Sequence, residues 1–381
     1  MSQPVLFEEL LCQNGRRIGV ASLASEKTLN ALSLEMVHLL TPQLLRWADD
    51  PQIAMVLLQA QGEKAFCAGG DLQQLYRTMR EHHASPQRDD IRGNRYAEEF
   101  FEHEYRLDYR LHTFPKPLLC WGHGIVMGGG IGLMAGCNHR VVTERSRLAM
   151  PEILIGLFPD VGGSWFLSRA PGKLGAFLAL TGVSMNANDA LLVGLADYRL
   201  THESKRQVLA TLLQQPWSDL PDANDALLTH ALRESEQAAD ASQFAPSSLR
   251  EHFDLINQLC SAPTPQETVA AILALETEQP WWHKAQANLK AGAPGSALLS
   301  LELQRRVRHR SLAEVFRLEL VVALHCAARP DFVEGIRALI IDKDNQPQWQ
   351  PARLEDASAA WLQGFFADPW AAEAHPLADL T

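Results

Sequence analysis

The six residues from Ile53 to Leu58 form an almost unbroken apolar run, which constrains the fold more than any other feature of the chain. A strand with one solvated face alternates apolar and polar residues, whereas a strand buried on both faces does not. Such strands belong to parallel sheets, whose crossover connections place helices on the sheet faces. The run therefore predicts a layered α/β protein.

Shorter segments on either side fit this prediction. Two apolar runs, Leu6–Leu11 and Arg17–Leu23, flank Gln13-Asn14-Gly15, which is typical of a β-hairpin. Further strands are predicted at Leu118–Trp121 and Arg140–Val142, with helices between the strands. The alternation of strands and helices favours an α/β fold with helical crossovers.

From about residue 200 onward, helical periodicity replaces the strand patterns. A chain of 381 residues suits one large domain with an appendage, or two domains. We expect an α/β core over residues 1–200 and a mainly helical region over residues 201–381. Helices are predicted over residues 203–213, 222–238, 247–260, 266–276, 296–306 and 312–327.

Composition narrows the class of partner and the compartment. The net charge of −11 argues against broad nucleic-acid binding, because a phosphate backbone needs a basic surface. No apolar stretch approaches the roughly 20 residues that span a bilayer, and the N-terminus does not resemble an export signal. The six cysteines are far apart, without metal-ligand spacing, which favours reduced thiols. We therefore expect a cytoplasmic protein that binds neither nucleic acid nor a membrane.

Two glycine-rich turns follow predicted strands. Ala68-Gly69-Gly70-Asp71 and Gly128-Gly129-Gly130 both lack bulky side chains, so their backbone N–H groups can approach a ligand and stabilise developing negative charge. One donor from each turn would make an oxyanion hole. The simpler alternative for the first turn is a tight connection in which Asp71 caps a helix. For the second, Gly130–Ala135 fits a loose dinucleotide-binding pattern, but it follows a glycine run instead of opening directly from a strand.

Two carboxylates, Glu152 and Asp160, lie eight positions apart in an otherwise apolar stretch. Apolar surroundings tune the acidity of a carboxyl group, and pairs of tuned carboxyls serve acid–base chemistry. The structural alternative is that Glu152 pairs with Arg140 or Arg145, while Asp160 caps a helix that starts at Val161. Without the glycine turns the two interpretations are evenly balanced.

Glu104 lies on the apolar stripe of a predicted helix that runs from Phe100 to Phe114. A carboxylate on a buried face is costly unless it is paired. It is therefore a candidate for binding a substrate hydroxyl or for a catalytic partner, and the alternative is an ion pair with Arg106, Arg110 or an arginine of another element.

Taken together, these motifs resemble the enoyl-CoA hydratase/isomerase (crotonase) superfamily. The glycine turns identify only the superfamily, whereas the combined pattern resembles its 3-hydroxyisobutyryl-CoA hydrolase branch over almost the whole chain. The matching segments are Asn30–Leu32, Ala68–Asp71, Phe100–Tyr105, Met127–Gly130, Ala149–Glu152, Gly156–Gly163, Gly172–Gly175, Leu178–Gly182, Asp331–Ala338 and Ile341–Asp344.

The resemblance implies a crotonase-like ββα spiral core that binds acyl-CoA and carries catalysis, followed by a helical C-terminal region. It implies hydrolysis of a 3-hydroxyacyl-CoA thioester in valine degradation, with no cofactor and no metal, because CoA is part of the substrate. Crotonase relatives are often oligomers, so a homo-oligomer is possible.

The resemblance also implies roles for single residues. Glu152 and Asp160 would be catalytic, and the N–H groups of Gly70 and Gly129 would form the oxyanion hole. Substrate-binding residues would be Glu104, Gly129 and Ala68.

One departure separates this chain from the hydratases. Hydratases carry a glutamate two residues after the glycine triplet, and this chain has Gly132 there. A hydratase or isomerase acting on another acyl-CoA is therefore the second interpretation. A non-catalytic acyl-CoA-binding protein is the third, although the presence of both glycine turns with both carboxylates argues against it.

Overall fold

The computed structural model describes residues 3–381 and divides into two compact units. The sheet unit contains the residues up to Gly70, Leu107–Leu148 and Met185–Arg250. The helical unit contains Asp71–Arg106, Ala149–Ser184 and Glu251–Thr381. Each unit takes residues from both sides of residue 200. Because the units reflect packing alone, the expected division of roles at residue 200 stays a prediction.

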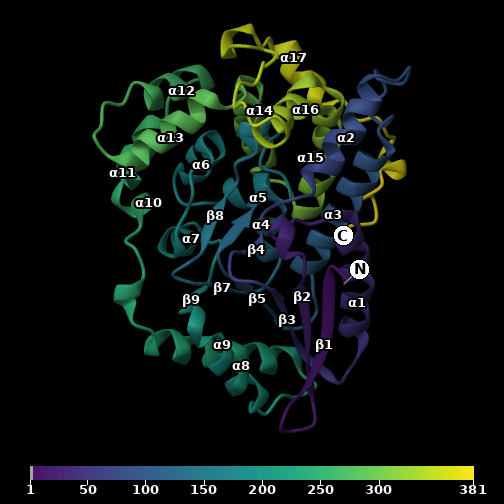
Figure 1. Cartoon of the computed structure of the whole chain (residues 1–381), viewed down its shortest axis with the longest axis vertical. Helices are drawn as coiled ribbons and strands as arrows, with labels where there is room; N and C mark the ends of the chain where they lie inside the picture. The colour runs from purple at the N-terminus through teal and green to yellow at the C-terminus, as the bar shows by residue number, and fades with distance from the viewer. Residues whose placement is uncertain (1–2) are drawn as a thin grey trace. The chain divides into compact units, whose positions relative to one another are not determined.

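The sheet unit is built on a six-stranded sheet with the order β1-β2-β3-β5-β7-β9 (Figure 1). Strands β1 and β2 pair antiparallel across the predicted hairpin, and the remaining neighbours pair parallel. Nearly every residue of β3 is buried between β2 and β5, as the apolar run predicted. The strands are β1 (Val5–Leu11), β2 (Arg17–Leu23), β3 (Ile53–Ala60), β5 (Leu118–Gly122), β7 (His139–Val142) and β9 (Tyr198–Arg199).

A second, three-stranded sheet has the order β4-β6-β8. Its strands are β4 (Ala65–Cys67), β6 (Ile125–Met127) and β8 (Arg147–Ala149). In chain order, a strand of the large sheet is followed by a strand of the small sheet three times, as β3-β4, β5-β6 and β7-β8, and each pair is followed by a helix. This repetition is the expected ββα spiral.

Helices cover both faces of the large sheet. On one face Trp47 packs so closely on Gly19 that a Cβ there would lie 2.8 Å from the indole ring. Ile18 points to the opposite face and joins a buried cluster with Leu212 and Leu228, because neighbouring strand residues alternate. The helices are α1 (Leu34–Asp49), α4 (Gly129–Ala135), α7 (Ala187–Val193), α8 (Lys205–Leu213) and α9 (Pro221–Ala238).

The helical unit packs around α15 (Leu312–Ala328), most of whose residues are buried. The helices predicted after residue 200 are confirmed, except that residues 247–260 form two helices, α10 (Ser248–Glu251) and α11 (Phe253–Leu259). Helix α3 (Arg95–His112) belongs to this unit up to Arg106. The other helices are α2 (Leu72–His83), α5 (Gly163–Leu167), α6 (Leu174–Thr181), α12 (Pro265–Leu273), α13 (Pro280–Ala291), α14 (Pro294–Val307), α16 (Pro330–Ile336) and α17 (Ala359–Gln363).

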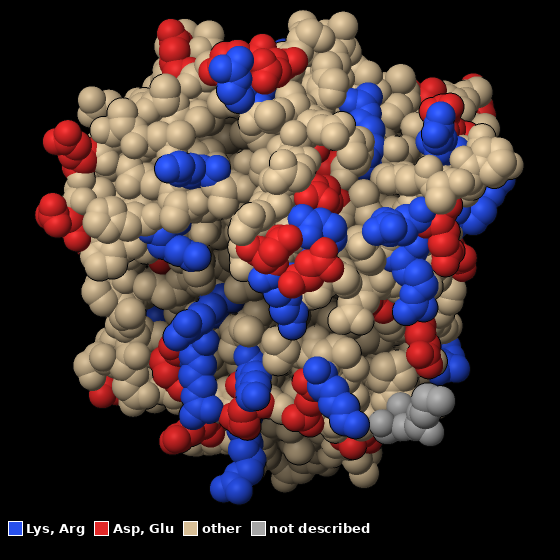
Figure 2. Space-filling view, turned by 45° about the horizontal axis from the view of Figure 1, so that its top comes forward, with Lys and Arg blue, Asp and Glu red and all other residues tan. Residues whose placement is uncertain are grey.

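The structure bears on two expectations, the one about membrane-spanning segments and the one about a basic surface. Between residues 3 and 381, no helix combines the length and apolar character needed to cross a membrane. On the face shown in Figure 2, the Lys and Arg side chains lie interspersed with Asp and Glu side chains, so this face does not present a purely basic patch.

Candidate active site

The three carboxylates singled out from the sequence all belong to the helical unit and are all buried. Glu104, Glu152 and Asp160 are 2%, 4% and 5% exposed. They come from α3, from the start of the 3-10 helix η2 (Glu152–Ile155), and from the turn before α5. After burial, the charge of Asp160 is the next cause that raises the pKa of both glutamates, so the protonation of the three groups is linked. We call them the carboxyl cluster.

Glu104 is held inside the unit by the amphipathic character of α3. Burial, and secondly the negative charge of Asp160, raise the pKa of its carboxyl well above the ordinary value. The proposed ion pair with Arg106 is wrong, because that arginine pairs with Glu102 and Asp379 instead. A neutral carboxyl in this position can donate a hydrogen bond as well as accept one.

Glu152 opens the turn of η2 directly after Pro151. Burial, followed by the charges of Asp160 and Glu104, raises the pKa of Glu152 well above its ordinary value. Its Oε2 atom is buried, and no hydrogen-bond partner for it occurs within residues 3–381. The alternative pairing is wrong, because Arg140 pairs with Asp197 and Arg145 pairs with Glu63. A buried oxygen without a partner costs about 1–3 kcal/mol, which favours a functional reason for its presence.

Asp160 has a different environment from the two glutamates. Burial raises its pKa to about 6, although a hydrogen bond from Tyr105 opposes the shift. The Tyr105 hydroxyl donates to Asp160 Oδ2 over 2.7 Å. The alternative role as a helix cap is wrong, because α5 begins at Gly163 and its N-cap residue is Gly162. Asp160 can therefore exchange a proton near neutral pH.

The three carboxyl groups of the cluster have different environments and therefore different pKa values. Three carboxyl groups that repel one another in an apolar site cannot all be ionised at neutral pH. Such a cluster can both give and take a proton, which is the requirement for general acid–base catalysis. The cluster therefore suits a reaction in which water or a leaving group changes its protonation state.

The two glycine turns lie side by side in the sheet unit. A Cβ at Gly130 would lie 2.3 Å from the carbonyl oxygen of Cys67, so the start of α4 packs directly on the end of β4. The role of the Gly70 and Gly129 N–H groups as an oxyanion hole stays a prediction.

The structure also places three residues in or near these turns. Asp71 caps α2, since its Oδ1 accepts the N–H of Gln74, so this part of the simpler interpretation is confirmed. Ala68 is half-buried and donates its N–H to Leu29. Gly132 lies buried inside α4, so no side chain extends from that position.

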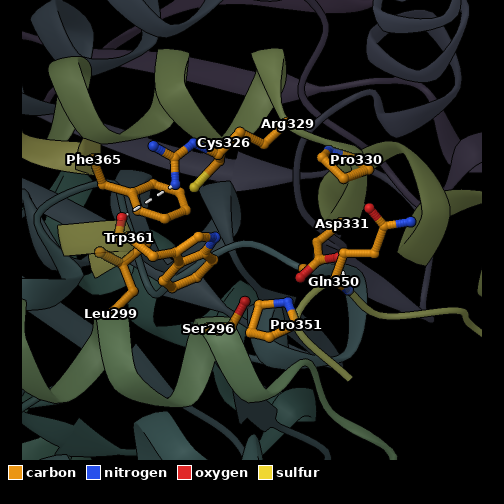
Figure 3. Close-up of a pocket in the computed structure, with 12 residues that line it drawn as sticks. Ser296, Leu299, Cys326, Arg329, Pro330, Asp331, Gln350, Pro351, Trp361 and Phe365 are labelled. Carbon is orange, nitrogen blue, oxygen red and sulfur yellow. Dashed lines mark hydrogen bonds between the residues drawn. The ribbon is translucent and has the colours of Figure 1, made fainter. Parts of the chain in front are cut away.

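A separate cavity of about 430 Å³ lies within the helical unit (Figure 3). Its lining includes Arg329 and Asp331, but no member of the carboxyl cluster. Arg329 stacks 3.6 Å from the centre of the Phe365 ring, and Asp331 accepts the N–H of Gln350. Both charged groups therefore hold the C-terminal segment in place, and we do not assign the active site to this cavity.

A family model described as "Enoyl-CoA hydratase/isomerase" matches residues 18–366. The chain belongs to this family. The chain is similar to the proteins named "3-hydroxyisobutyryl-CoA hydrolase, mitochondrial" from Gallus gallus, with 34% sequence identity, and from Homo sapiens, with 35% sequence identity. In both cases the similarity covers 94% of this chain and 88% of the relative. The resemblance found in the motifs is therefore confirmed.

Two solved members of this fold support the predicted architecture. An enoyl-CoA hydratase from Rhodobacter sphaeroides 2.4.1 has a TM-score of 0.80 and 32% identity, covering 96% of this chain and 98% of that one. A carnitinyl-CoA dehydratase from Mycobacterium thermoresistibile has a TM-score of 0.81 and 32% identity, and the match covers 96% of this chain and 97% of that one. The predicted α/β crotonase-like fold with a helical C-terminal region is confirmed.

The expectation of a cytoplasmic protein is wrong by the same comparisons. The hydrolases from Gallus gallus, Xenopus tropicalis and Homo sapiens are all named as mitochondrial. All six cysteines are buried and form no disulfide within the described residues, as expected of reduced thiols. Reduced thiols do not distinguish the cytoplasm from other reducing compartments, so they do not identify the compartment.

Sequence reasoning missed two polar residues that touch this site. Tyr105 bonds Asp160, and Glu319 accepts the N–H groups of Gly162 and Ser164 in the turn that follows Asp160. Glu319 lies in a strongly apolar helix. The criterion that identified Glu104, a carboxylate on a buried helical stripe, would also have found Glu319.

Proposed function

We propose that this protein hydrolyses the thioester of 3-hydroxyisobutyryl-CoA, or of a closely related short 3-hydroxyacyl-CoA, to the free acid and CoA. The observation that carries this proposal is the buried carboxyl cluster in a chain that has Gly132 where hydratases carry a glutamate. The names of the relatives at 34–35% identity support the same substrate. This activity would belong to valine degradation.

The proposed oxyanion hole consists of the N–H groups of Gly70 and Gly129. Attack on a thioester carbonyl places negative charge on its oxygen, and two backbone donors stabilise that charge without needing to titrate. Removing one such donor typically costs about 10²–10³ in rate. Ala68 and Gly129 would also contact the substrate.

Glu152 and Asp160 are the proposed catalytic residues, and two routes are open to them. In one route the Glu152 carboxylate attacks the carbonyl, the C–S bond breaks to give a mixed anhydride, and water opens the anhydride. In the other, Glu152 removes a proton from the water that attacks the thioester. In both, Asp160 positions the water or assists protonation of the departing thiolate.

Glu104 is the proposed partner of the substrate's 3-hydroxyl group. A buried carboxyl that has no hydrogen-bond partner is destabilised, because it has been removed from water without compensation. A site that binds a hydroxyl group therefore rejects the analogue that lacks this hydroxyl. Isobutyryl-CoA should therefore be a much poorer substrate than its 3-hydroxy counterpart. The reaction consumes only water and the acyl-CoA, and we propose no cofactor and no metal.

The test is thiol release from 3-hydroxyisobutyryl-CoA, with the enoyl absorbance of crotonyl-CoA followed in parallel. Rapid thiol release without loss of the enoyl signal supports the hydrolase. The two similar solved structures are an enoyl-CoA hydratase and a carnitinyl-CoA dehydratase, so a hydratase or dehydratase is the second candidate. Loss of the enoyl signal without thiol release would favour that candidate, and tight binding without turnover would favour an acyl-CoA-binding protein.

A further inference from the structure

The turn that follows Asp160 is held by a glutamate from α15. Glu319 is 0% exposed, and its two oxygens accept the N–H groups of Gly162 over 2.8 Å and Ser164 over 2.9 Å. The N–H of Gly163 turns back to the carbonyl oxygen of Asp160 over 2.6 Å. Three successive N–H groups are thereby directed to defined acceptors, which leaves this segment a single backbone geometry.

That geometry includes a strained residue. Val161 has φ +52°, a left-handed conformation that a β-branched side chain rarely adopts. Such a conformation costs about 1–3 kcal/mol and persists only where the surrounding structure imposes it. The Glu319 bonds begin at the next residue, Gly162, and the ring of Phe316 lies 3.3 Å from where a Cβ of Gly162 would stand. Helix α15 therefore supplies the restraint that keeps Val161 strained.

The side chain of Asp160 is fixed from a different element. Tyr105 lies on α3 directly after Glu104, is 0% exposed, and donates its hydroxyl to Asp160 Oδ2 over 2.7 Å. The Tyr105 and Phe316 rings lie 5.8 Å apart, so the tyrosine also packs on α15. The backbone and the carboxyl of Asp160 are thus held by separate groups.

We propose that Glu319 and Tyr105 are positioning residues for Asp160: Glu319 fixes the backbone that presents this carboxylate, and Tyr105 fixes its side chain and favours its charged form. The proposal rests on the catalytic role assigned to Asp160 above. Catalytic groups must be placed to within a fraction of an ångström, and a misplacement of about 1 Å can cost roughly 10²-fold in rate. Neither residue needs to touch the substrate.

Glu319→Gln tests the backbone half of the proposal. The amide keeps one acceptor oxygen but turns an N–H donor toward the second backbone N–H, so one of the two bonds is lost. We expect kcat for thiol release to fall about 10- to 100-fold, while KM changes less than about threefold, because substrate binding is not affected. Asp331→Asn is the matched control, because Asp331 is also a buried carboxyl of this unit that accepts a backbone N–H.

Wild-type kcat in folded Glu319→Gln, or an equal loss of kcat in Asp331→Asn, would overturn the backbone half of the proposal.

Tyr105→Phe tests the side-chain half of the proposal without removing a buried charge. Because the lost hydrogen bond favours the carboxylate, its removal raises the pKa of Asp160, and the acidic limb of the pH profile moves to higher pH.

A measurement without substrate separates this proposal from the proposed function. In protein labelled with ¹³C at the Asp carboxyls, the Asp160 signal is the one missing from Asp160→Asn. Its titration midpoint should rise in Tyr105→Phe, and an unchanged midpoint would overturn the side-chain half. Failure of the wild-type protein to release thiol would count against the hydrolase alone, since the titration does not depend on turnover.

Discussion

The glycine turns of the sheet unit and the carboxyl cluster of the helical unit supply polar groups in opposite ways. At Gly70 and Gly129 the proposed donors are backbone N–H groups, which carry no titratable charge. In the cluster, the useful groups are side chains whose acidity depends on burial and on one another. Backbone donors therefore depend on packing alone, whereas the carboxylates depend on packing and on pH.

The same contrast applies to the tolerance of each region to change. A glycine turn is damaged by adding atoms, because the neighbouring backbone has no room to move. A carboxylate is damaged by removing its charge, even when the replacement has the same shape. Variants of the two regions should consequently differ in how their effects depend on pH.

The largest effect is expected from the carboxylates themselves. Glu152→Gln and Asp160→Asn should each lower turnover by at least about a hundredfold while leaving the fold intact, because each removes a proton-transfer or nucleophilic group. Thiol release measures the rate, circular dichroism the fold, and Asp331→Asn serves as the buried-carboxyl control. A folded variant with near-wild-type turnover would remove that residue from the mechanism.

A smaller loss is expected at the glycine turn. Gly130→Ala places a methyl 2.3 Å from the Cys67 carbonyl oxygen, which forces α4 away from β4 and misplaces the oxyanion donors. Turnover should fall about 10- to 100-fold at every pH, with the midpoint of the pH profile unchanged. Gly122→Ala is the control, since the added methyl there mainly meets the flexible side chain of Met134. A shifted midpoint in Gly130→Ala would break the contrast between the two regions.

The pH profile of the wild-type protein should follow the cluster. Asp160 has a pKa of about 6, so its carboxylate predominates above that pH and is lost below it. If the carboxylate is required, kcat/KM should fall about tenfold for each pH unit below 6. An acidic limb with its midpoint near 4, the ordinary value for an aspartate, would show that burial does not tune this group in solution.

The smallest effect concerns stability at a carboxyl outside the site. Burial raises the pKa of Asp331 to about 6 from an ordinary value near 3.8. The folded state therefore binds the proton more tightly than the unfolded state, and this stabilisation is lost as pH rises from 4 through 6. Between pH 4 and pH 7, the free energy of unfolding measured in urea should fall by roughly 2 kcal/mol less in Asp331→Asn than in the wild type. Equal losses in both proteins would contradict the shift.

The parts of the fold that could be predicted are those where the local pattern of residues is enough to identify the element. The run Ile53–Leu58 correctly indicated a strand buried on both faces, and Asn14-Gly15 correctly indicated the hairpin. A helix over 280–291 went unpredicted, because its Trp281-Trp282 pair shows no simple stripe; Trp282 is buried against Phe177. Contacts of that kind join residues about a hundred positions apart and leave no local pattern.

The sequence by itself determined the family, the glycine turns and the identity of the three carboxylates, because each depends on residue types at short spacing. Only the tertiary structure decided which arginines pair elsewhere, that Asp160 is bonded by Tyr105, and that Glu319 holds the turn that follows it. The physical reason is that the acidity and orientation of a buried carboxyl depend on groups that folding brings together. Glu319 lies 159 positions from Asp160 in the chain, and burial together with the charge of Asp160 raises the pKa of Glu319 to about 8 only in the folded protein.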